Sequence, residues 1–486
     1  MNINKTIILL GSENHIGVWI KEMEQMLNST VDIYVLQDSN TITLIDKLFL
    51  KLNYFIFNKP NTLKKIDKNI EFISLNKLPS LIQSYNTIVN FTNYNLSDFK
   101  KEHIINFKIN DVFFNEKTII YHTTKLDDKI NLTIGSKTNS YTNTVRFHPF
   151  SVSKNIDLVL HMFLDMLSIY LNKTLLTSNL IFTKDNSNNT PLFIHYVNYT
   201  LRILKKVFHS IFYNEQWVLG YNFIDSNDKF RISNINKLTP PKDRFWADPI
   251  VVEEQGVIYI FIEELIYNNK IAHLSVIKLN DDGTYSKPCK ILEKNYHLSY
   301  PFVFKHEDTY YMVPETANNN DIQLYKSVSF PEKWEFVKTL ITNVKASDTT
   351  LLFYNNKWWM FTSIKKYEYG TYDNDLSIFH ATDLLSDTWK PHSMNPVKRN
   401  ISNSRQGGNF IKKEDEIFRI SQNGEVRYGY GFNINKIKLL TESLYKEETV
   451  YSFKPNKKNT KIKGIHTYSQ NERIKVYDIL ISKFKF

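Results

Sequence analysis

The fold of this chain is decided by the stretch Arg244-Phe-Trp-Ala-Asp-Pro-Ile-Val-Val252. It places one carboxylate, Asp248, between an aromatic pair and a proline, just ahead of an apolar run. A second apolar run, Val257-Ile-Tyr-Ile-Phe-Ile-Glu-Glu264, follows after a short polar segment. This pattern predicts a strand, a turn and a second strand.

The same pattern returns four more times, each time with a polar residue at the corresponding place. If Asp248, Tyr300, Asp348, Gln406 and His466 are equivalent, the intervals between them are 52, 48, 58 and 60 residues. Intervals of this size are typical of propeller blades. Because most of the repeats contain apolar runs for three or four strands, residues 217–486 are predicted to form a five-bladed β-propeller. The run from Trp217 to Ile224 is expected to supply the closing strand of the last blade.

The first 180 residues have a different pattern, and a chain of 486 residues is too long for one ordinary core. Its expected elements are a strand Thr6 to Leu10, a turn Gly11 to Gly17, a helix Val18 to Leu27, strands Val31 to Leu36, Thr87 to Phe91 and Thr118 to His122, and a helix Ile156 to Leu176. Strand, glycine turn, helix and strand begin a Rossmann-like layer. We therefore predict a multidomain chain, with an N-terminal α/β Rossmann-like domain over residues 1–180 and the all-β propeller at its C-terminal side.

Only Gly11 and Gly17 are present where a dinucleotide-binding fingerprint has three glycines, so nucleotide binding and a purely structural role both stay open for this domain. The segment faintly resembles the N-terminal domain of formyltransferases, whose catalytic Asn, His and Asp cannot be placed here. Residues 181–216 are predicted to form a linker and a basic amphipathic helix from Leu192 to Phe212. That helix either joins the two domains or makes a peripheral contact with a membrane surface.

The formal net charge of +11 is spread along the chain without the basic block of a nucleic-acid-binding arm. It indicates a solvated basic surface or an acidic partner such as anionic lipid, nucleotide phosphate or acidic polysaccharide. Cys289 is the only cysteine, so no disulfide forms within the chain and a reducing compartment is expected. The first apolar run is too short for a signal peptide, and no long apolar helix lacks charges. We expect a cytoplasmic protein, with contact at the inner face of the membrane as an alternative.

The polar residues of the repeat follow a register. Asp248 to Glu263, Tyr300 to Glu315 and Asp348 to Ser363 each span 15 residues, and Gln406 to Gln422 spans 16. Because the first two strands of a blade form a hairpin, these side chains are expected at one end of the propeller. The expected set is Asp248, Glu263, Tyr300, Glu315, Asp348, Arg405, Gln406, Gln422 and His466. The alternative is that such residues merely cap strand ends and bind turn amides.

Arg244, Trp246 and Tyr300 adjoin this set. Aromatic planes beside carboxylates suit a sugar ring, because the apolar faces of the ring stack and its hydroxyl groups take charged hydrogen bonds. The histidines show no metal-ligand spacing, so no metal is expected. The sequence thus predicts a carbohydrate site.

The propeller resembles the five-bladed glycoside hydrolases of family 43 and of the invertase type. In family 43 an aspartate that opens blade one before a proline is the base, a second aspartate opens blade three and tunes pKa, and a glutamate that opens blade four is the general acid. Asp248-Pro249 matches the first and Asp348 matches the second, but the fourth blade opens with Arg405-Gln-Gly-Gly408. The resemblance therefore implies a base without the usual acid.

Five motifs resemble more closely the propeller domain named after plant glucosamine inositolphosphorylceramide transferases. They are Phe245-Trp-Ala-Asp-Pro249, His297-Leu-Ser-Tyr-Pro-Phe302, Val313-Pro-Glu-Thr316, Ser347-Asp-Thr-Thr350 and His466-Thr467. Bacterial relatives carry this domain behind a formyltransferase-like domain in polysaccharide gene clusters. The resemblance implies a role in making capsule or lipopolysaccharide.

The missing acid favours transfer over hydrolysis. Expelling an alcohol from a glycoside needs a proton donor, whereas a nucleotide-activated sugar expels a phosphate and needs only a base for the acceptor hydroxyl. We therefore expect a glycosyltransferase without a cofactor that moves a sugar, for example fructofuranose, from a nucleotide sugar to a polysaccharide or glycolipid acceptor. A furanoside hydrolase with Glu315 as a relocated acid, and a non-catalytic glycan-binding propeller, remain alternatives.

Within the expected transferase, each predicted residue has a role. Asp248 is the base and Asp348 orients the base or stabilises an oxocarbenium ion. Glu263 and Glu315 accept hydrogen bonds from sugar hydroxyls. The remaining substrate ligands are Arg244, Trp246, Tyr300, Arg405, Gln406, Gln422 and His466.

Overall fold

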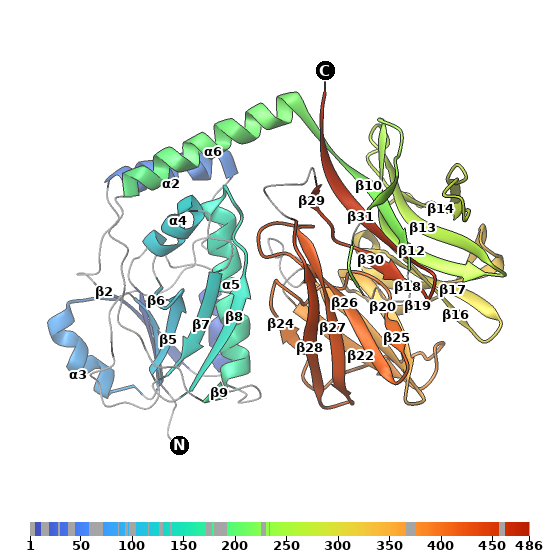
Figure 1. Ribbon diagram of the computed structural model, residues 1–486. Helices are drawn as coiled ribbons and strands as arrows, with labels where there is room; N and C mark the ends of the chain where they lie inside the picture. Colours follow the sequence, from blue (N-terminus) through green and yellow to red (C-terminus); the bar gives the residue numbers. More distant parts are fainter. Residues whose placement is uncertain are drawn as a thin grey trace. The chain divides into compact units, whose positions relative to one another are not determined.

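The structure is a computed structural model. It describes residues 5–10, 19–27, 30–36, 44–57, 71–85, 87–92, 96, 104–114, 116–125, 130–136, 139–171, 177–178, 192–224, 230–232, 234–365, 375–455 and 462–485. The chain divides into two compact units, Met1–Phe208 and His209–Phe486 (Figure 1). Each unit is described by itself.

The first unit is built on one mixed sheet, in the order β3-β2-β1-β4-β5-β7-β8-β9 with β6 beside β5. Its strands are β1 Lys5–Leu10, β2 Thr30–Leu36, β3 Glu71–Ile73, β4 Thr87–Phe91, β5 Ile104–Ile109, β6 Val112–Phe113, β7 Ile130–Gly135, β8 Asn139–Val145 and β9 Thr177–Ser178. The pairs from β3 through β5 are parallel, and those from β5 onward are antiparallel. Ile7 to Leu10 in β1 are fully buried, as expected for a strand covered on both faces.

The helices of this unit are α1 Trp19–Leu27, α2 Leu44–Phe57, α3 Leu78–Gln83, α4 Glu116–Lys125, α5 Val152–Leu171 and α6 Leu192–Phe212, which continues into the second unit. In the described part of the chain, none is long and apolar enough to cross a membrane. The α/β character is as predicted. Because the sheet is mixed, the Rossmann-like assignment of the unit stays a prediction, and the expected turn from Gly11 to Gly17 lies outside the described residues.

The predicted strand from Thr118 to His122 is wrong, because these residues lie in α4. Thr and Ile favour strands by local propensity, but packing decides here. Ile119, Ile120 and Thr123 are buried, and the Thr123 hydroxyl accepts a hydrogen bond from Asn155 Nδ2 of α5 at 2.9 Å. The interaction with α5 is long-range in sequence, so local patterns do not reveal it.

The second unit is the predicted five-bladed propeller (Figure 1). Blade one holds β12 Arg244–Glu254, β13 Val257–Ile266, β14 His273–Leu279 and β15 Cys289–Leu292; blade two holds β16 Ser299–His306, β17 Thr309–Glu315, β18 Asp321–Ser329 and β19 Lys333–Thr342. Blade three holds β20 Ala346–Tyr354, β21 Lys357–Ile364, β22 Asp375–Ala381, β23 Lys390–Pro391 and β24 Lys398–Arg399; blade four holds β25 Ile411–Lys413, β26 Glu416–Asn423, β27 Gly431–Leu440 and β28 Tyr445–Phe453.

The fifth blade joins the two ends of the unit. It combines β10 Tyr213–Phe223 and β11 Asn236–Leu238 with β29 Ile462–Gly464, β30 Tyr468–Gln470 and β31 Ile474–Phe484. β10 pairs antiparallel with β31 along its whole length, which confirms the predicted closing strand. The ring continues into blade one, because the Val251 amide donates to Ser469 Oγ at 2.9 Å.

The inner strands of the first three blades share one irregularity. The ladder skips two residues after Ala247, after Ser299 and after Ser347. The first skipped residue is Asp248, Tyr300 or Asp348, with φ of 50°, 45° and 52°. Such left-handed bulges re-aim a side chain, and in residues other than glycine they are often found at functional sites. They confirm that these three positions are equivalent, as the repeat predicts.

The fourth blade departs from this pattern. Gln406 keeps a ladder bridge to Ser421, and regular pairing resumes only at Ile411. Gly408 has a φ of 152°, and a Cβ there would lie 1.8 Å from the Tyr468 carbonyl oxygen. The close approach of two blades explains the glycine at this opening.

Candidate active site

Four carboxyl groups from the first three blades form what we call the carboxylate cluster: Asp248, Glu263, Glu315 and Asp348. Glu263 and Glu315 stand opposite Ala247 and Ser299, directly before the bulges. Asp248 is 4% exposed and Asp348 is 1% exposed. The charge of Asp248 helps to raise the pKa of the other three groups, so the four act within one electrostatic field.

Asp248 is held by donors from two other blades. Its Oδ1 accepts a hydrogen bond from Thr467 Oγ1 at 2.7 Å and lies 3.3 Å from His466 Nε2. Its Oδ2 accepts from the Tyr300 amide at 3.3 Å. The carboxylate is therefore fixed in orientation by blades two and five.

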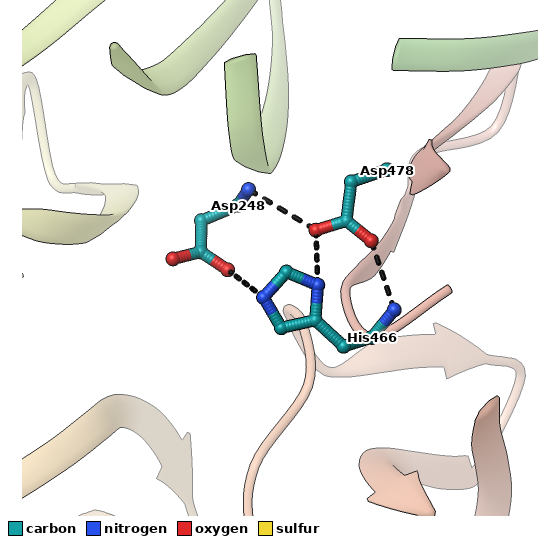
Figure 2. A group of neighbouring side chains, drawn as sticks. All are labelled: Asp248, His466 and Asp478. Atoms are coloured by element: carbon teal, nitrogen blue, oxygen red, sulfur yellow. Dashed lines mark hydrogen bonds and ion pairs between the residues drawn. The ribbon is translucent and has the colours of Figure 1, made fainter. Parts of the chain in front are cut away.

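His466 lies between two carboxylates, as Figure 2 shows. Its Nδ1 is 2.5 Å from Asp478 Oδ2, and the other Asp478 oxygen accepts from the amides of His466 and Thr467 at 2.8 and 3.1 Å. Burial by itself would lower the pKa of His466, but Asp478 and Asp248 raise it to about 9. At neutral pH the ring is therefore an imidazolium that compensates the charge of Asp248.

Asp248, His466 and Asp478 also have ligand atoms close enough to share a cation, although the sequence predicts no metal site. The contacts fit a metal poorly. Each ring nitrogen of His466 faces a different carboxylate, whereas an ion would need one of them to be free of its proton. Asp478 already accepts backbone amides on both oxygens, from His466, Thr467 and Asp248. We therefore treat this trio as an ion-paired group, in which His466 lies between two carboxylates and backbone amides hold Asp478 in place.

Asp348 is paired with a cation. Arg405 Nε lies 2.5 Å from Asp348 Oδ2 and its Nη2 lies 3.3 Å from Oδ1, while Gln422 Nε2 donates to Oδ2 at 2.8 Å. Burial raises the pKa of the Asp348 carboxyl above its usual range, and the Arg405 guanidinium opposes that rise. Arg405, near the opening of blade four, is thus the cationic partner of Asp348.

Both glutamates of the cluster have a pKa above that of an ordinary carboxyl group, and Glu315 holds its proton at neutral pH. Burial and the charge of Asp348 raise the pKa of Glu315 to about 8, against the opposing effect of Arg405. Burial raises the pKa of Glu263 to about 7, and the ion pair with His297, at 3.0 Å, opposes this. Glu315 is partly exposed and also accepts the Asp348 amide at 3.2 Å, so it is a protonated carboxyl group that solvent can reach.

The predicted substrate ligands Arg244 and Trp246 lie elsewhere. Arg244 Nη1 and Trp246 Nε1 both donate to Glu264 Oε1, at 3.0 and 3.1 Å, and Trp246 is only 2% exposed within an apolar core. Neighbouring residues on a strand point to opposite faces, so Glu263 joins the cluster while Glu264 turns to the other side. The prediction for these two residues is therefore corrected to a structural role.

Tyr300 and Gln406 are also structural in their side chains. The Tyr300 hydroxyl is fully buried between Thr350 Oγ1 at 2.8 Å and the Gly408 backbone at 3.0 Å, so only its amide serves the cluster. Gln406 Oε1 accepts from Arg419 Nη1 at 2.7 Å, inside blade four. Gln406 makes an isolated ladder bridge to Ser421 and has no bulge with a left-handed backbone like that of Asp248, so its side chain is not re-aimed in the same way.

The structure adds residues that sequence reasoning missed. Tyr428 is 44% exposed, its ring lies 5.2 Å from the Arg405 guanidinium and it meets the His466 ring edge-on at 5.3 Å. Trp217 lies 4.4 Å from the same imidazole. Asp478 is the one acidic residue of β31 and lies between the apolar pairs Val476-Tyr477 and Ile479-Leu480, and this is the signal that could have identified it. Tyr428 carries no comparable signal.

The fold and the cluster define a five-bladed β-propeller with a polar site where its inner strands begin. The chain belongs to the family described as "Glucosamine inositolphosphorylceramide transferase 1, N-terminal", whose model matches residues 226–479. It is 31% identical over 210 residues to glucosamine inositolphosphorylceramide transferase 1 of Oryza sativa subsp. japonica, a match that covers 42% of this chain and 28% of that protein. The protein of the same name from Arabidopsis thaliana is 29% identical over 219 residues, 44% of this chain and 28% of that protein. The match thus spans little more than a quarter of these relatives.

Solved structures with a similar chain course include two glycoside hydrolases. A family 117 glycoside hydrolase of Zobellia galactanivorans has a TM-score of 0.37 and 11% identity, over 54% of this chain and 90% of that one. The catalytic domain of a Coprinopsis cinerea GH62 alpha-L-arabinofuranosidase also has a TM-score of 0.37 and 11% identity, over 48% and 90%. A likeness at this level is no evidence for a shared reaction.

Proposed function

We propose that the protein is a glycosyltransferase that moves a sugar from a nucleotide-activated donor to a hydroxyl group of a glycan or glycolipid. The observation that carries the proposal is the ion pair between Asp348 and Arg405: the fourth blade opens with Arg405-Gln-Gly-Gly408 and without a carboxylic acid, while the first blade has the Asp248 carboxylate. Membership in a family named for a transferase supports it. In this reaction the leaving group is the nucleotide phosphate of the donor, which departs without being protonated.

In the proposed step, the acceptor hydroxyl gives its proton to the Asp248 carboxylate. The oxygen of the acceptor hydroxyl then bonds to the anomeric carbon of the donor sugar. At the same time the bond from that carbon to the phosphate oxygen breaks, and the nucleotide leaves. The charges suit an anionic donor, because the cations of Arg405 and His466 and the proton on Glu315 offset the carboxylates. His466, with both ring nitrogens against carboxylates, acts on Asp248 as a positioning residue and is not itself a substrate ligand.

The finer parts of the proposal follow from the same chemistry. Glu263, Glu315 and Gln422 would bind sugar hydroxyls, and Tyr428 would stack on a ring face. The acceptor would be a surface polysaccharide or a glycolipid, the latter because the relatives are named for transfer to inositolphosphorylceramide. A furanose such as fructofuranose is the proposed sugar. We further propose that the α/β unit is Rossmann-like and helps to dock the donor, and that the reaction takes place in the cytoplasm, where activated sugars are made.

A screen tests the proposal. The purified chain is incubated with single nucleotide sugars, with and without glycan and glycolipid acceptors, and released nucleotide is measured. We expect release with one donor class and a strong increase when an acceptor is added. If no donor on a broad panel is consumed while glycans still bind saturably, the propeller is a glycan-binding module and the proposal fails.

A second candidate function, hydrolysis of furanosides, is favoured by one observation. Glu315 has its pKa raised to about 8, so it carries a proton at neutral pH and loses it as the pH rises through 8. That is the state a general acid needs.

The Glu315→Gln substitution separates the two functions. Hydrolysis should fall on the order of 10²-fold or more, because the acid is lost. Transfer should keep most of its rate, because the departing phosphate requires no proton. Initial rates measured from pH 6 to 9 provide the check: a wild-type rate that falls above about pH 8, together with a nearly inactive Glu315→Gln variant, would favour the hydrolase.

The Tyr428→Ala substitution should raise KM for the sugar substrate about two- to tenfold with little change in kcat. An aromatic stacking contact contributes roughly 0.5–1.5 kcal/mol, and 1.4 kcal/mol corresponds to about tenfold. Tyr428→Phe keeps the ring and should behave like wild type. Tyr267→Ala, which removes a tyrosine that is also partly exposed (37%), is the matched control. An unchanged KM in Tyr428→Ala would exclude the stacking role.

A further inference from the structure

Two helices of the α/β unit, α2 and α6, have an apolar face that is exposed in the described part of the chain. We call it the α2–α6 face. Its described members are between 42% and 60% exposed: Leu48, Leu52 and Ile56 of α2, and Ile194, Val197, Leu201, Leu204, Val207 and Phe208 of α6. They recur three, four or seven residues apart, so in each helix they form one stripe. Contiguous exposed apolar surface of this kind marks an interaction site.

The two helices lie side by side in the same unit (Figure 1). The Phe49 ring lies 4.6 Å from the Tyr196 ring and 5.2 Å from the Tyr199 ring, and Asn53 Nδ2 donates to the Tyr199 hydroxyl at 3.2 Å. These contacts show which side of each helix faces the other and the rest of the unit. The two apolar stripes therefore belong to one surface.

The inward side of α6 is the more polar one. Tyr199 donates to the Phe150 carbonyl at 2.6 Å, and Arg202 Nη2 donates to the carbonyls of Thr123 and Thr124 at 3.3 and 2.5 Å. A helix on the surface of a water-soluble domain normally buries its apolar stripe and exposes its polar one. In α6 the arrangement is reversed: the polar side packs inward, and the exposed apolar stripe suits an apolar partner.

Charge identifies the kind of partner. The sequence of α6 contains Arg202, Lys205 and Lys206 and no acidic residue. Lys205 is exposed beside its apolar stripe, and Lys47 and Lys51 are exposed beside that of α2. The Lys206 ammonium group lies over the Phe150 ring, 4.5 Å from its centroid, on the inward side of α6. Apolar side chains bordered by lysines fit a bilayer with anionic headgroups, because the chains enter the acyl boundary while the ammonium groups meet the lipid charge.

We propose that the α2–α6 face is the surface by which this protein binds an anionic membrane, with both helices lying in the plane of the headgroups. Neither helix is long and apolar enough to span the bilayer, so the contact is peripheral. The proposal goes beyond the proposed function, since it holds whatever reaction the propeller performs.

Sedimentation of the full chain with vesicles tests it. The probes are vesicles of neutral phosphatidylcholine, and the same lipid with 30 mol% phosphatidylglycerol added. We expect the wild type to bind the anionic vesicles at least tenfold more tightly than the neutral ones. The variant Leu48→Gln/Leu52→Gln/Leu201→Gln/Leu204→Gln should lose at least tenfold of this affinity, and Lys51→Gln/Lys205→Gln should lose most of the preference for anionic lipid.

The matched control removes equally exposed apolar residues elsewhere. Val328→Gln/Leu444→Gln changes residues of the propeller that are 57% and 48% exposed, and it should bind vesicles like the wild type. Circular dichroism shows that each variant is folded, and since only exposed residues change, each should melt within a few degrees of wild type. Binding of neither vesicle type, or full binding by the four-leucine variant, would overturn the proposal. A dimer in light scattering that the four-leucine variant abolishes would show that a second copy covers the face, and would also overturn it.

Discussion

The Asp248→Asn substitution should lower the rate of sugar transfer on the order of 10²–10⁴-fold, the contribution typical of a general base. The amide keeps the shape of the side chain, but its single oxygen can accept from only one of the two present donors, the Thr467 hydroxyl and the Tyr300 amide. It cannot take the acceptor proton. The loss should therefore appear in kcat, with KM for the donor nearly unchanged, in a steady-state assay of released nucleotide.

Two comparisons make this result specific. Asp387→Asn removes a carboxylate that is 99% exposed and paired with Lys338, so it should leave the rate unchanged. A thermal melt of Asp248→Asn should show a folded propeller. If Asp248→Asn is folded and transfers sugar at more than a tenth of the wild-type rate, Asp248 is not the base.

The Arg419→Met substitution should destabilise the propeller by about 3–5 kcal/mol, the range found when one partner of a buried ion pair is removed. Arg419 is fully buried, and its Nε and Nη2 donate to Glu447 at 2.8 and 2.7 Å. It also donates to the carbonyls of Asn403 and Ser404 and to Gln406. Without it, Glu447 would remain buried with only Lys398 and Tyr445 as partners.

Urea unfolding of the propeller, followed by tryptophan fluorescence, measures this loss. Arg473→Met is the control, because Arg473 pairs with Glu253 and Asp281 at the surface and such pairs contribute about 1 kcal/mol or less. Equal stability of the Arg419→Met and wild-type proteins would show that the network does not support blade four. The two substitutions thus separate a structural arginine from a solvated one within the same domain.

The repeat made the propeller predictable from the sequence. Asp248, Tyr300 and Asp348 recur at blade-length intervals, and the structure gives them the same bulge and the same left-handed backbone. The strand from Trp217 was predictable as the closing strand, because the fifth blade needs one more strand to complete the ring. In the α/β unit the local sequence pattern predicts the structure less well. The residues around Ile119 are predicted to form a strand but lie in a helix, because they pack against α5.

The candidate site was predictable only in part. Register brought Glu263, Glu315, Arg405, Gln422 and His466 to the correct end, because a hairpin fixes where its strands begin and end. Register does not show toward which face of the blade each adjacent side chain points. The sequence therefore predicts Trp246 and Gln406 in the site, whereas both side chains pack inside blades. Tyr428 and Trp217 reach His466 from distant parts of the chain, and no local pattern encodes such contacts.

The most direct test of the central claim is the stoichiometry of transfer at the carboxylate cluster. With the donor identified by the screen, mass spectrometry of the acceptor and quantification of free nucleotide are made on the same reaction. The account predicts one sugar added to the acceptor for each nucleotide released, with both products lost together in Asp248→Asn. Sugar released from a glycan in the absence of any donor, or equal products from the wild type and Asp248→Asn, would contradict it.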